Sequence, residues 1–141
     1  MAGTNSSANN TPPPMRLVFL SDLYRMDAWT KVRFLGYVDD YKVPSASLVL
    51  KHHYPAEQPH VTVYVDVEHI LGCLTHAEVQ VGAWLNVWGY IMPKLATRGG
   101  RKITKNAERV VRVQAAYVNS ADGVDVGMYE RRLQKLKDTG F

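Results

Sequence analysis

Five segments of the chain alternate apolar and polar residues with a period of two, the pattern of strands that bury one face. The predicted strands are KVRFLGYVDD (31–40), SLVLKHH (47–53), HVTVYVDV (60–67), AWLNVWGYIM (83–92) and RVVRVQAAYV (109–118). The residues predicted to face the core are Val32, Phe34, Gly36, Val38, Leu48, Leu50, Val61, Val63, Val65, Val67, Ala83, Leu85, Val87, Ile91, Val111, Val113, Ala115 and Tyr117. A glycine in the middle of the first strand, Gly36, predicts a bend or bulge there, because one long strand must serve both ends of a closed sheet.

Two further segments have helical spacing. DVEHILGCLTH (66–76) predicts a helix of about three turns at most, with an apolar stripe of Val67, Ile70, Leu71 and Leu74. DVGMYERRLQKLKD predicts an amphipathic C-terminal helix over about residues 125–137, with Asp125 as its N-cap and Gly140 after the last turn. Its apolar residues form a narrow seam, which is typical of a helix that packs on another helix. The seam consists of Val126, Tyr129, Leu133 and Leu136.

Three strands, a short helix and two more strands follow one another in the order of a five-stranded OB-fold barrel, an all-β fold with short helices. The spacing alone also suits other small barrels. Residues 15–141 are long enough for a single domain with a core. Residues 1–14 have almost no apolar content and end in three prolines, so we expect a disordered tail there.

The overall composition narrows the class of protein. The chain is 46% hydrophobic and 21% charged, as in soluble globular domains. We expect no membrane span, because no apolar run approaches the ~18 residues that one requires. The single cysteine, Cys73, excludes an internal disulfide and fits a reducing compartment, the cytosol or the nucleus.

Positive charge is concentrated between the fourth and fifth strands. From Lys94 to Arg112 there are seven Lys or Arg residues and one acid, a local balance of +6, whereas the whole chain carries +4. The centre of this stretch is RGGRKITK, here called the basic loop (residues 98–105). The corresponding loop of an OB fold commonly borders the oligonucleotide groove.

We therefore predict phosphate contacts of single-stranded nucleic acid in this region, since clustered cations neutralise the backbone. The predicted contact residues are Lys94, Arg98, Arg101, Lys102 and Lys105. The alternative is a solvated hairpin connection without a ligand.

Aromatic residues project from the outer side of the predicted strands, namely Tyr37, Tyr64, Trp84, Trp88 and Tyr90. For Tyr37 and Tyr64, which lie on strands that line the usual OB groove, we predict base stacking, with cover by protein as the alternative. For Trp84 and Trp88 we predict a protein partner, with cover by the N-terminal segment 16–29 or base stacking as alternatives.

Metal and catalytic chemistry have little support in the sequence. His69, Cys73 and His76 lie on one side of the predicted short helix, but structural zinc requires four ligands. Phosphate-binding glycine loops, nucleophile elbows and paired carboxylates with a clear pocket are not found. We expect no cofactor, no metal and no enzymatic activity, and keep a small metal-dependent nucleic-acid enzyme as an alternative from another class.

Several segments, taken in order, resemble one known family. KVRFLGYVDDY, LVLKHHYP, VTVYVDVEHIL, EVQVGAWLNVWGYI and VRVQAAYVNSADGVDVGMYE together resemble the fungal Ten-one family, the smallest subunit of the CST telomere-capping complex. The resemblance runs from about Leu17 to Leu136 and leaves out the tail and the basic loop. VRFLG, NVWGY and VDVGMYERRL are more distantly similar to the small subunit of replication protein A.

The resemblance implies an OB barrel whose C-terminal helix pairs with a second OB subunit, called Stn-one in the family. Such a dimer joins a larger DNA-binding subunit on single-stranded G-rich DNA at telomeres in the nucleus. It assists capping, limits telomerase and supports lagging-strand fill-in. The partner-facing positions that the resemblance implies are Met128, Tyr129, Leu133 and Leu136. Val126, from the same apolar seam, and the outward Trp84 and Trp88 are also predicted to contact the partner.

Two alternatives to this assignment remain at the level of the sequence. The chain could be the small scaffold subunit of a trimer similar to replication protein A. The terminal helix could also close its own barrel, with its basic residues as a solvated face.

Overall fold

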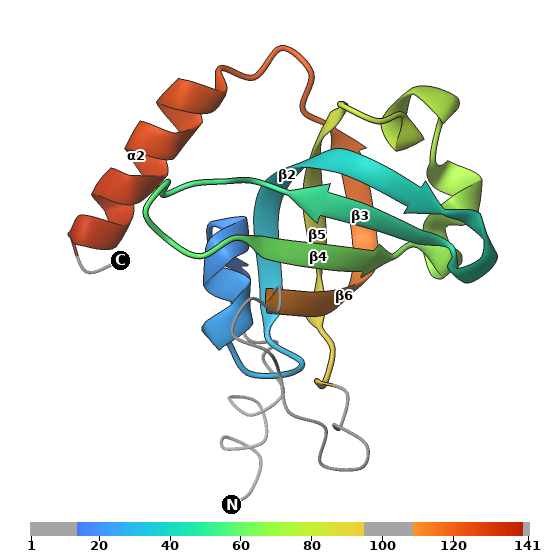
Figure 1. The fold of residues 1–141 in the computed structure, drawn as a ribbon, viewed down its shortest axis with the longest axis horizontal. Coiled ribbons are helices and arrows are strands. Elements are labelled where there is room, and N and C mark those ends of the chain that lie inside the picture. Colours follow the sequence, from blue (N-terminus) through green and yellow to red (C-terminus); the bar gives the residue numbers. More distant parts are fainter. Residues whose placement is uncertain (1–13, 95–108, 140–141) are drawn as a thin grey trace, which may run out of the picture.

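The computed structural model describes residues 14–94 and 109–139. Within them the chain forms a barrel with a helix at one side (Figure 1). The elements are β1 (Arg16–Leu17), η1 (Leu20–Arg25), β2 (Lys31–Lys42), η2 (Val43–Ser45), β3 (Ser47–Lys51), β4 (Val61–Asp66), η3 (Glu68–Cys73), η4 (His76–Val79), β5 (Trp84–Ile91), β6 (Arg109–Ser120) and α2 (Val126–Asp138). The η elements are 3-10 helices and α2 is an α-helix.

Five of the six strands close into a barrel. The sheet order is β1-β2-β3-β4-β6-β5, and β2 also pairs with β5, which closes the ring. The long strand β2 pairs with β5 over residues 31–37 and with β3 over residues 37–42. All five predicted strands are confirmed, and the closed five-stranded OB barrel is confirmed with them. The short strand β1, which pairs in parallel with β2 outside the barrel, was not predicted.

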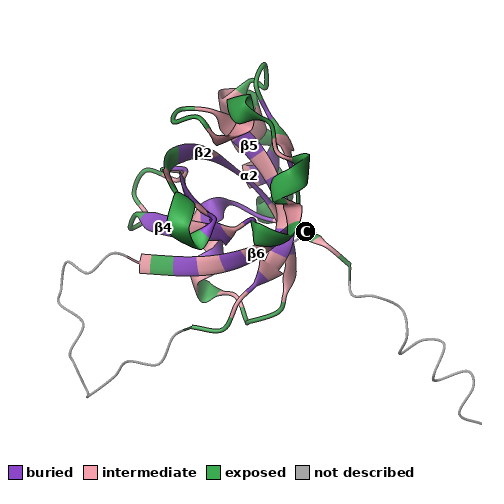
Figure 2. Cartoon of the chain, turned by 90° about the vertical axis from the view of Figure 1, so that its right-hand side faces the viewer, coloured by how far each residue is buried: buried purple, intermediate pink, exposed green. Residues whose placement is uncertain are grey.

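The core of the barrel contains the predicted apolar positions. All the predicted inward residues except Ala83 and Tyr117 are buried, and the half-buried Ala83 still packs against the core. Figure 2 shows the resulting alternation of buried and less buried residues along β6. Leu35 and Val49 are also buried, although they point to the opposite face from their core-facing neighbours in the strands. Both lie outside the core cluster, on the outer side of the barrel.

The prediction for Gly36 is wrong in its location. The bulge of β2 lies between Val38 and Asp40, whereas Gly36 is in regular register with Leu85. A Cβ atom on Gly36 would approach Leu20 Cδ1 to 3.0 Å. A glycine at this position therefore favours the close packing of η1 on the strand.

The inward prediction for Tyr117 is also wrong, because a register shift reverses the alternation of β6. Trp88 pairs with Tyr117, but the next residue of β5, Gly89, pairs with Ala115. Between these two pairs β6 therefore has one residue more than β5, as in a β-bulge. Tyr117 consequently points outward and is 54% exposed.

The N-terminal segment closes one end of the barrel through η1. Leu20 and Leu23 are buried in the core cluster, and the Asp22 carboxylate accepts a hydrogen bond from the Phe19 N–H at 3.0 Å. This arrangement resembles the predicted alternative in which the segment folds over the barrel. The segment contributes to the core itself, however, with Leu20 and Leu23.

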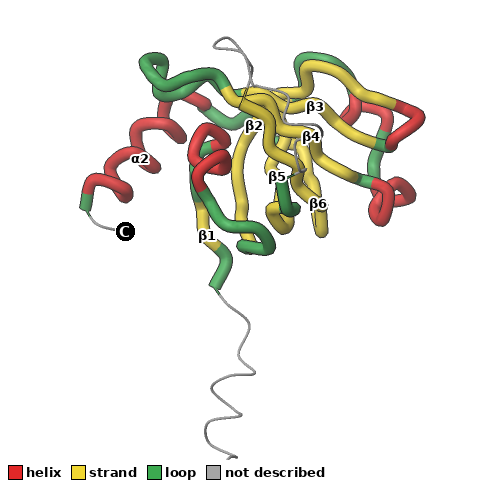
Figure 3. The backbone as a smooth tube through the Cα atoms, turned by 60° about the horizontal axis from the view of Figure 1, so that its bottom comes forward, coloured by secondary structure: helices red, strands yellow, loops and turns green. Residues whose placement is uncertain are grey.

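The predicted helix at 66–76 is replaced by two short 3-10 helices, η3 and η4 (Figure 3). Val67 is buried and Leu71 is 42% exposed, so the predicted stripe is not a continuous buried face. Thr75 interrupts the helical segment as the cap of η4, and its N–H donates to Glu78 at 2.8 Å. Short helical segments commonly take the 3-10 form, because an isolated α-helix of this length is marginal.

The described residues contain neither a membrane-spanning helix nor a group of metal ligands. No helix in residues 14–94 and 109–139 is long and apolar enough to cross a membrane. Among these same residues, no three His, Cys, Asp or Glu side chains are grouped so that they could hold a metal ion.

Candidate partner and nucleic-acid surfaces

The predicted C-terminal helix is confirmed as α2, and its start follows from its sequence. The Asp125 carboxylate accepts a hydrogen bond from the Met128 N–H at 3.0 Å, as expected of an N-cap. Lys135 and Lys137 lie in the last turn, where cations interact favourably with the helix dipole. Gly140, predicted to follow the helix, lies outside the described residues.

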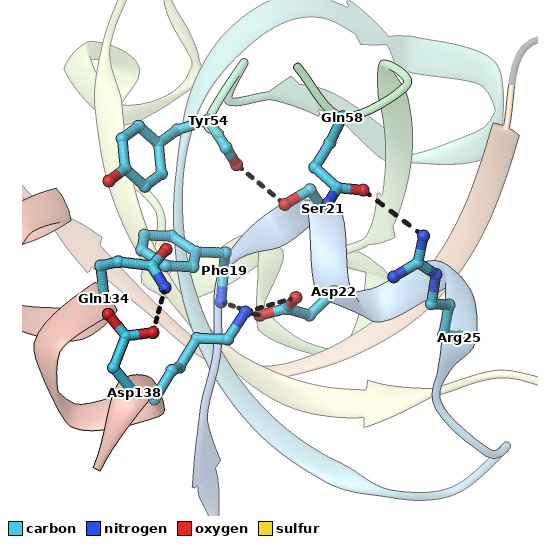
Figure 4. Close-up of polar contacts among 9 residues, drawn as sticks. Phe19, Ser21, Asp22, Arg25, Tyr54, Gln58, Gln134 and Asp138 are labelled. Carbon is cyan, nitrogen blue, oxygen red and sulfur yellow. Dashed lines mark hydrogen bonds and ion pairs between the residues drawn. The ribbon is translucent and has the colours of Figure 1, made fainter. Parts of the chain in front are cut away.

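Helix α2 lies beside η1 at one side of the barrel (Figures 1 and 3). Two polar contacts join it to the rest of the chain. Glu130 Oε2 lies 2.7 Å from His52 Nε2, and Lys137 Nζ donates to Asp22 at 2.9 Å. The Lys137 ammonium also lies 5.2 Å from the centre of the Phe19 ring. Figure 4 shows Phe19 and Asp22 next to the end of α2.

The apolar seam of α2 is divided between its own chain and the surface. Leu133 is 2% exposed, whereas Met128 and Leu136 are 41% and 42% exposed. Val126 and Tyr129 are half-buried. This corrects the expectation that the whole seam is offered to a partner, because Leu133 is already covered in the isolated chain. A partner role for the other positions stays a prediction.

The exposed part of the seam borders a groove of about 280 Å³. It lies between α2 and β1, and its lining is mainly apolar. The lining residues are Leu17, Val124, Asp125, Met128, Tyr129, Arg132, Leu133 and Leu136. The alternative that α2 closes its own barrel is not supported, because no residue of α2 belongs to the barrel core cluster. One side of the helix is covered by its own chain at Leu133, and the side with Met128 and Leu136 is exposed.

Polar atoms without partners are buried near this groove. Arg33 Nε and the Tyr129 hydroxyl have no hydrogen-bond partner among the described residues. Burial raises the pKa of Tyr129 to about 12, and the nearby charge of Arg33 opposes that shift. Buried groups of this kind normally have partners, so the absence of one is informative.

Arg33 also belongs to an outward row across three strands. Its guanidinium lies 4.8 Å from the Trp88 ring centre, and the Trp88 and Tyr117 rings are 5.1 Å apart. The register places Arg33 opposite Trp88 and Trp88 opposite Tyr117. Trp88 is half-buried by these neighbours, and its predicted partner role is not tested by them.

Trp84 has a different environment from Trp88. Its ring is 5.3 Å from both the His52 ring and the Tyr37 ring. The N-terminal segment reaches this cluster through Phe19, whose ring is 6.3 Å from that of His52. Trp84 is therefore partly covered by its own chain, and a partner contact there stays a prediction.

The two tyrosines predicted to stack on bases lie on one outer face of the barrel. Tyr37 pairs with Lys51, and Val49, on the same side of β3, pairs with Tyr64. Tyr64 is in turn opposite Arg112 of β6. Both tyrosines are half-buried. The face thus combines aromatic rings with cations, as surfaces that bind single strands do.

The predicted phosphate contacts lie mostly outside the described residues. Arg98, Arg101, Lys102 and Lys105 belong to residues 95–108, so the structure does not test them. Lys94 is exposed, and its ammonium lies 4.2 Å from the centre of the Tyr24 ring.

Sequence reasoning missed Arg33 and Tyr24 as candidate functional residues. The signal for Arg33 was its outward position in a predicted strand between two inward residues, Val32 and Phe34. Its position opposite Trp88 depends on strand register, which alternation alone does not provide. No signal in the sequence pointed to Tyr24, because η1 was not predicted.

The comparison with protein families decides the identity. The sequence profile of the Ten1 (Ten-one) family, described as "Telomere capping, CST complex subunit", matches residues 6–134. The chain belongs to the Ten1 family. This confirms the resemblance noted in the sequence.

Solved structures agree in fold with this Ten1-family chain. A chain of the S. pombe Stn1-Ten1 complex matches with a TM-score of 0.60 and 22% identity, over 91% of this chain and 96% of that chain. The telomere capping protein Ten1 from Saccharomyces pombe matches with a TM-score of 0.59 and 22% identity, over 89% and 99%. The hypothetical protein ygiW from E. coli matches with a TM-score of 0.53 and 11% identity, over 79% and 100%. A comparison with curated protein sequences finds no match.

Proposed function

We propose that this chain is a non-enzymatic accessory subunit of a telomere-capping complex, which acts in the nucleus at chromosome ends. It forms a heterodimer with a Stn1-type OB subunit through α2. The dimer helps a larger subunit to bind single-stranded G-rich DNA, which supports end protection, telomerase regulation and lagging-strand fill-in. Membership of the Ten1 family supports this proposal, as does the S. pombe complex of Stn1 and Ten1.

The observation that carries the heterodimer is the half-open groove along α2. Met128 and Leu136 are each more than 40% exposed beside a groove that residues 14–94 and 109–139 leave unfilled. Large exposed apolar residues that line a hollow are typical of protein interfaces.

The exposed lining of the groove indicates the chemistry of the partner. Met128 and Leu136 are the large apolar side chains that it exposes. We infer that the partner presents apolar side chains to these two residues.

A double substitution tests this proposal. Met128→Asp with Leu136→Asp should weaken binding to the Stn1-type subunit by at least about 100-fold, because two charges would enter an apolar contact. The measurement is the heterodimer dissociation constant by calorimetry, with circular dichroism to confirm that the variant is folded.

Arg131→Asp provides the matched control, because it places the same side chain on α2 at an exposed position outside the groove lining. We expect its dissociation constant to stay within about twofold of the unsubstituted chain. Unchanged affinity in the double variant would contradict the proposal. Identification of the larger protein that co-purifies would separate this function from a scaffold role in a trimer like replication protein A.

A further inference from the structure

Two cations share one aromatic ring at the end of the barrel that η1 closes. Lys94 Nζ lies 4.2 Å from the centre of the Tyr24 ring, and Arg109 Cζ lies 4.9 Å from the same centre. Both distances are within the ~6 Å range of cation–π attraction. The two positive centres therefore lie within about 9 Å of each other.

Three separate elements bring these residues together. Tyr24 is in η1, which packs into the barrel core through Leu20 and Leu23. Lys94 follows the end of β5, and Arg109 is the first residue of β6. The two cations thus stand at the two ends of the connection that contains the basic loop.

Within the described residues, Lys94 and Arg109 have no matching negative group. Among residues 14–94 and 109–139, neither Lys94 nor Arg109 forms a salt bridge within 4.0 Å, whereas Lys42, Lys51 and Lys137 do. Like charges at this distance repel, and the face of one ring attracts each of them only weakly. An anion placed between the cations would relieve the repulsion.

The position of Lys94 and Arg109 relative to the outer face of the barrel indicates which kind of anion would bind between them. Arg112 lies three residues after Arg109 on β6 and faces Tyr64 across the pair with β4. The Met92 N–H donates to the Arg112 carbonyl at 2.8 Å, which places the start of the connection to Lys94 beside Arg112. Arg109 and Arg112 point to opposite faces of β6, so a single strand that passed from the end of the barrel onto the outer face would meet the pair of cations first, and then Arg112 and the Tyr64 ring.

We propose that Lys94 and Arg109, held by Tyr24, form a phosphate clamp for the backbone of single-stranded DNA at the η1 end of the barrel. Lys94 and Arg109 contact the phosphates, and Tyr24 is a positioning residue that holds both side chains in reach. The clamp deepens the proposed function and depends on its nucleic-acid part. The clamp does not distinguish sequences, because phosphate contacts carry no base information.

The test measures binding of the full chain, alone and in the heterodimer, to a single-stranded telomeric oligonucleotide over a series of salt concentrations. Lys94→Gln with Arg109→Gln should weaken binding at least tenfold at low salt. It should also reduce the slope of log affinity against log salt by about 0.7 for each phosphate contact that is lost. Lys42→Gln with Arg131→Gln removes the same charge elsewhere and should leave the slope unchanged.

Substitutions of Tyr24 separate positioning from folding. Tyr24→Leu should weaken binding about fivefold and reduce the slope, because the ring no longer holds the two cations. Tyr24→Phe keeps the ring and should restore the original affinity and slope. Thermal unfolding and heterodimer formation identify any variant that fails to fold. If the Tyr24 variants fail to fold, the double variant of Lys94 and Arg109, which lie at the surface, provides the decisive measurement.

The outcomes distinguish the clamp from the function on which it depends. An unchanged slope in the Lys94 and Arg109 double variant overturns the clamp and leaves the proposed function intact. If the unsubstituted heterodimer shows no oligonucleotide binding, the clamp and the nucleic-acid part of the proposed function are both overturned. A slope that falls equally in the Lys42 and Arg131 control also overturns the clamp, because the effect would then depend on net charge alone.

Discussion

Leu133 is covered by its own chain, although it belongs to the apolar seam of α2 that was predicted to face a partner. Its side chain is 2% exposed, and it lies outside the barrel core cluster, together with Phe19 and Leu35. Leu133 lines the groove between α2 and β1 together with Leu17, so its burial is part of the attachment of α2 to its own chain. The polar contacts of α2 to His52 and Asp22 complete that attachment.

We predict that Leu133→Ala destabilises the isolated chain by about 2–4 kcal/mol, because a buried leucine leaves a cavity when it is shortened. Leu136→Ala, at 42% exposure, should cost less than about 1 kcal/mol and is the matched control. The free energy of unfolding in urea provides the comparison. Equal losses for both variants would show that the division of the seam is incorrect.

At the scale of elements, η1 connects the two candidate surfaces. Asp22 of η1 accepts a hydrogen bond from Lys137 of α2. The ring of Tyr24, also in η1, contacts Lys94 and Arg109, the two cations of the proposed clamp. Leu20 and Leu23 fix η1 in the core between these two contacts. The six residues of η1 thus position both α2 and the two cations at the ends of the β5–β6 connection relative to the barrel.

The start of α2 provides the prediction at this scale. Asp125→Ala removes the acceptor for the Met128 N–H and should reduce helix stability by about 1 kcal/mol. Asp125→Asn keeps an acceptor and should retain most of that stability. Amide hydrogen exchange of the first turn of α2 measures the effect, and equal exchange in all three proteins would contradict the role of the cap.

At the scale of the whole molecule, the charge is asymmetric. The stretch from Lys94 to Arg112 carries +6 and the rest of the chain sums to −2. Of its seven cations, Lys94, Arg109 and Arg112 lie in the described residues, at one end of the barrel and on the adjoining outer face. A polyanion approaching the molecule would be attracted to this side.

Neutralising the basic loop tests this asymmetry. Arg98→Gln, Arg101→Gln and Lys102→Gln together should lower the affinity of the heterodimer for a single-stranded oligonucleotide. The salt slope should fall by about 2, which corresponds to three phosphate contacts on a single strand. A control that neutralises Lys42, Arg131 and Lys135 removes equal charge elsewhere. If both the affinity and the slope are unchanged in the loop variant, the loop is a solvated connection without a ligand.

Three predictions about the fold failed, namely the inward position of Tyr117, the bulge at Gly36 and the continuous helix at 66–76. Tyr117 points outward because a register shift between β5 and β6 inserts an extra residue, and no local pattern announces that shift. Gly36 leaves room for the approach of Leu20, a residue sixteen positions earlier that belongs to an unpredicted element. The segment at 66–76 has helical spacing, but Thr75 caps the separate 3-10 helix η4 and interrupts it.

The sequence by itself determined the five strands, the order of an OB barrel and the amphipathic C-terminal helix with its cap. These features depend on alternation and spacing between near neighbours, which each segment carries locally. The tertiary structure alone decided that Leu133 is covered while Met128 and Leu136 stay open, that Arg33 lies over Trp88, and that Tyr24 joins Lys94 to Arg109. These contacts join residues far apart in the chain, and barrel closure and strand register, which set them, are properties of the whole fold.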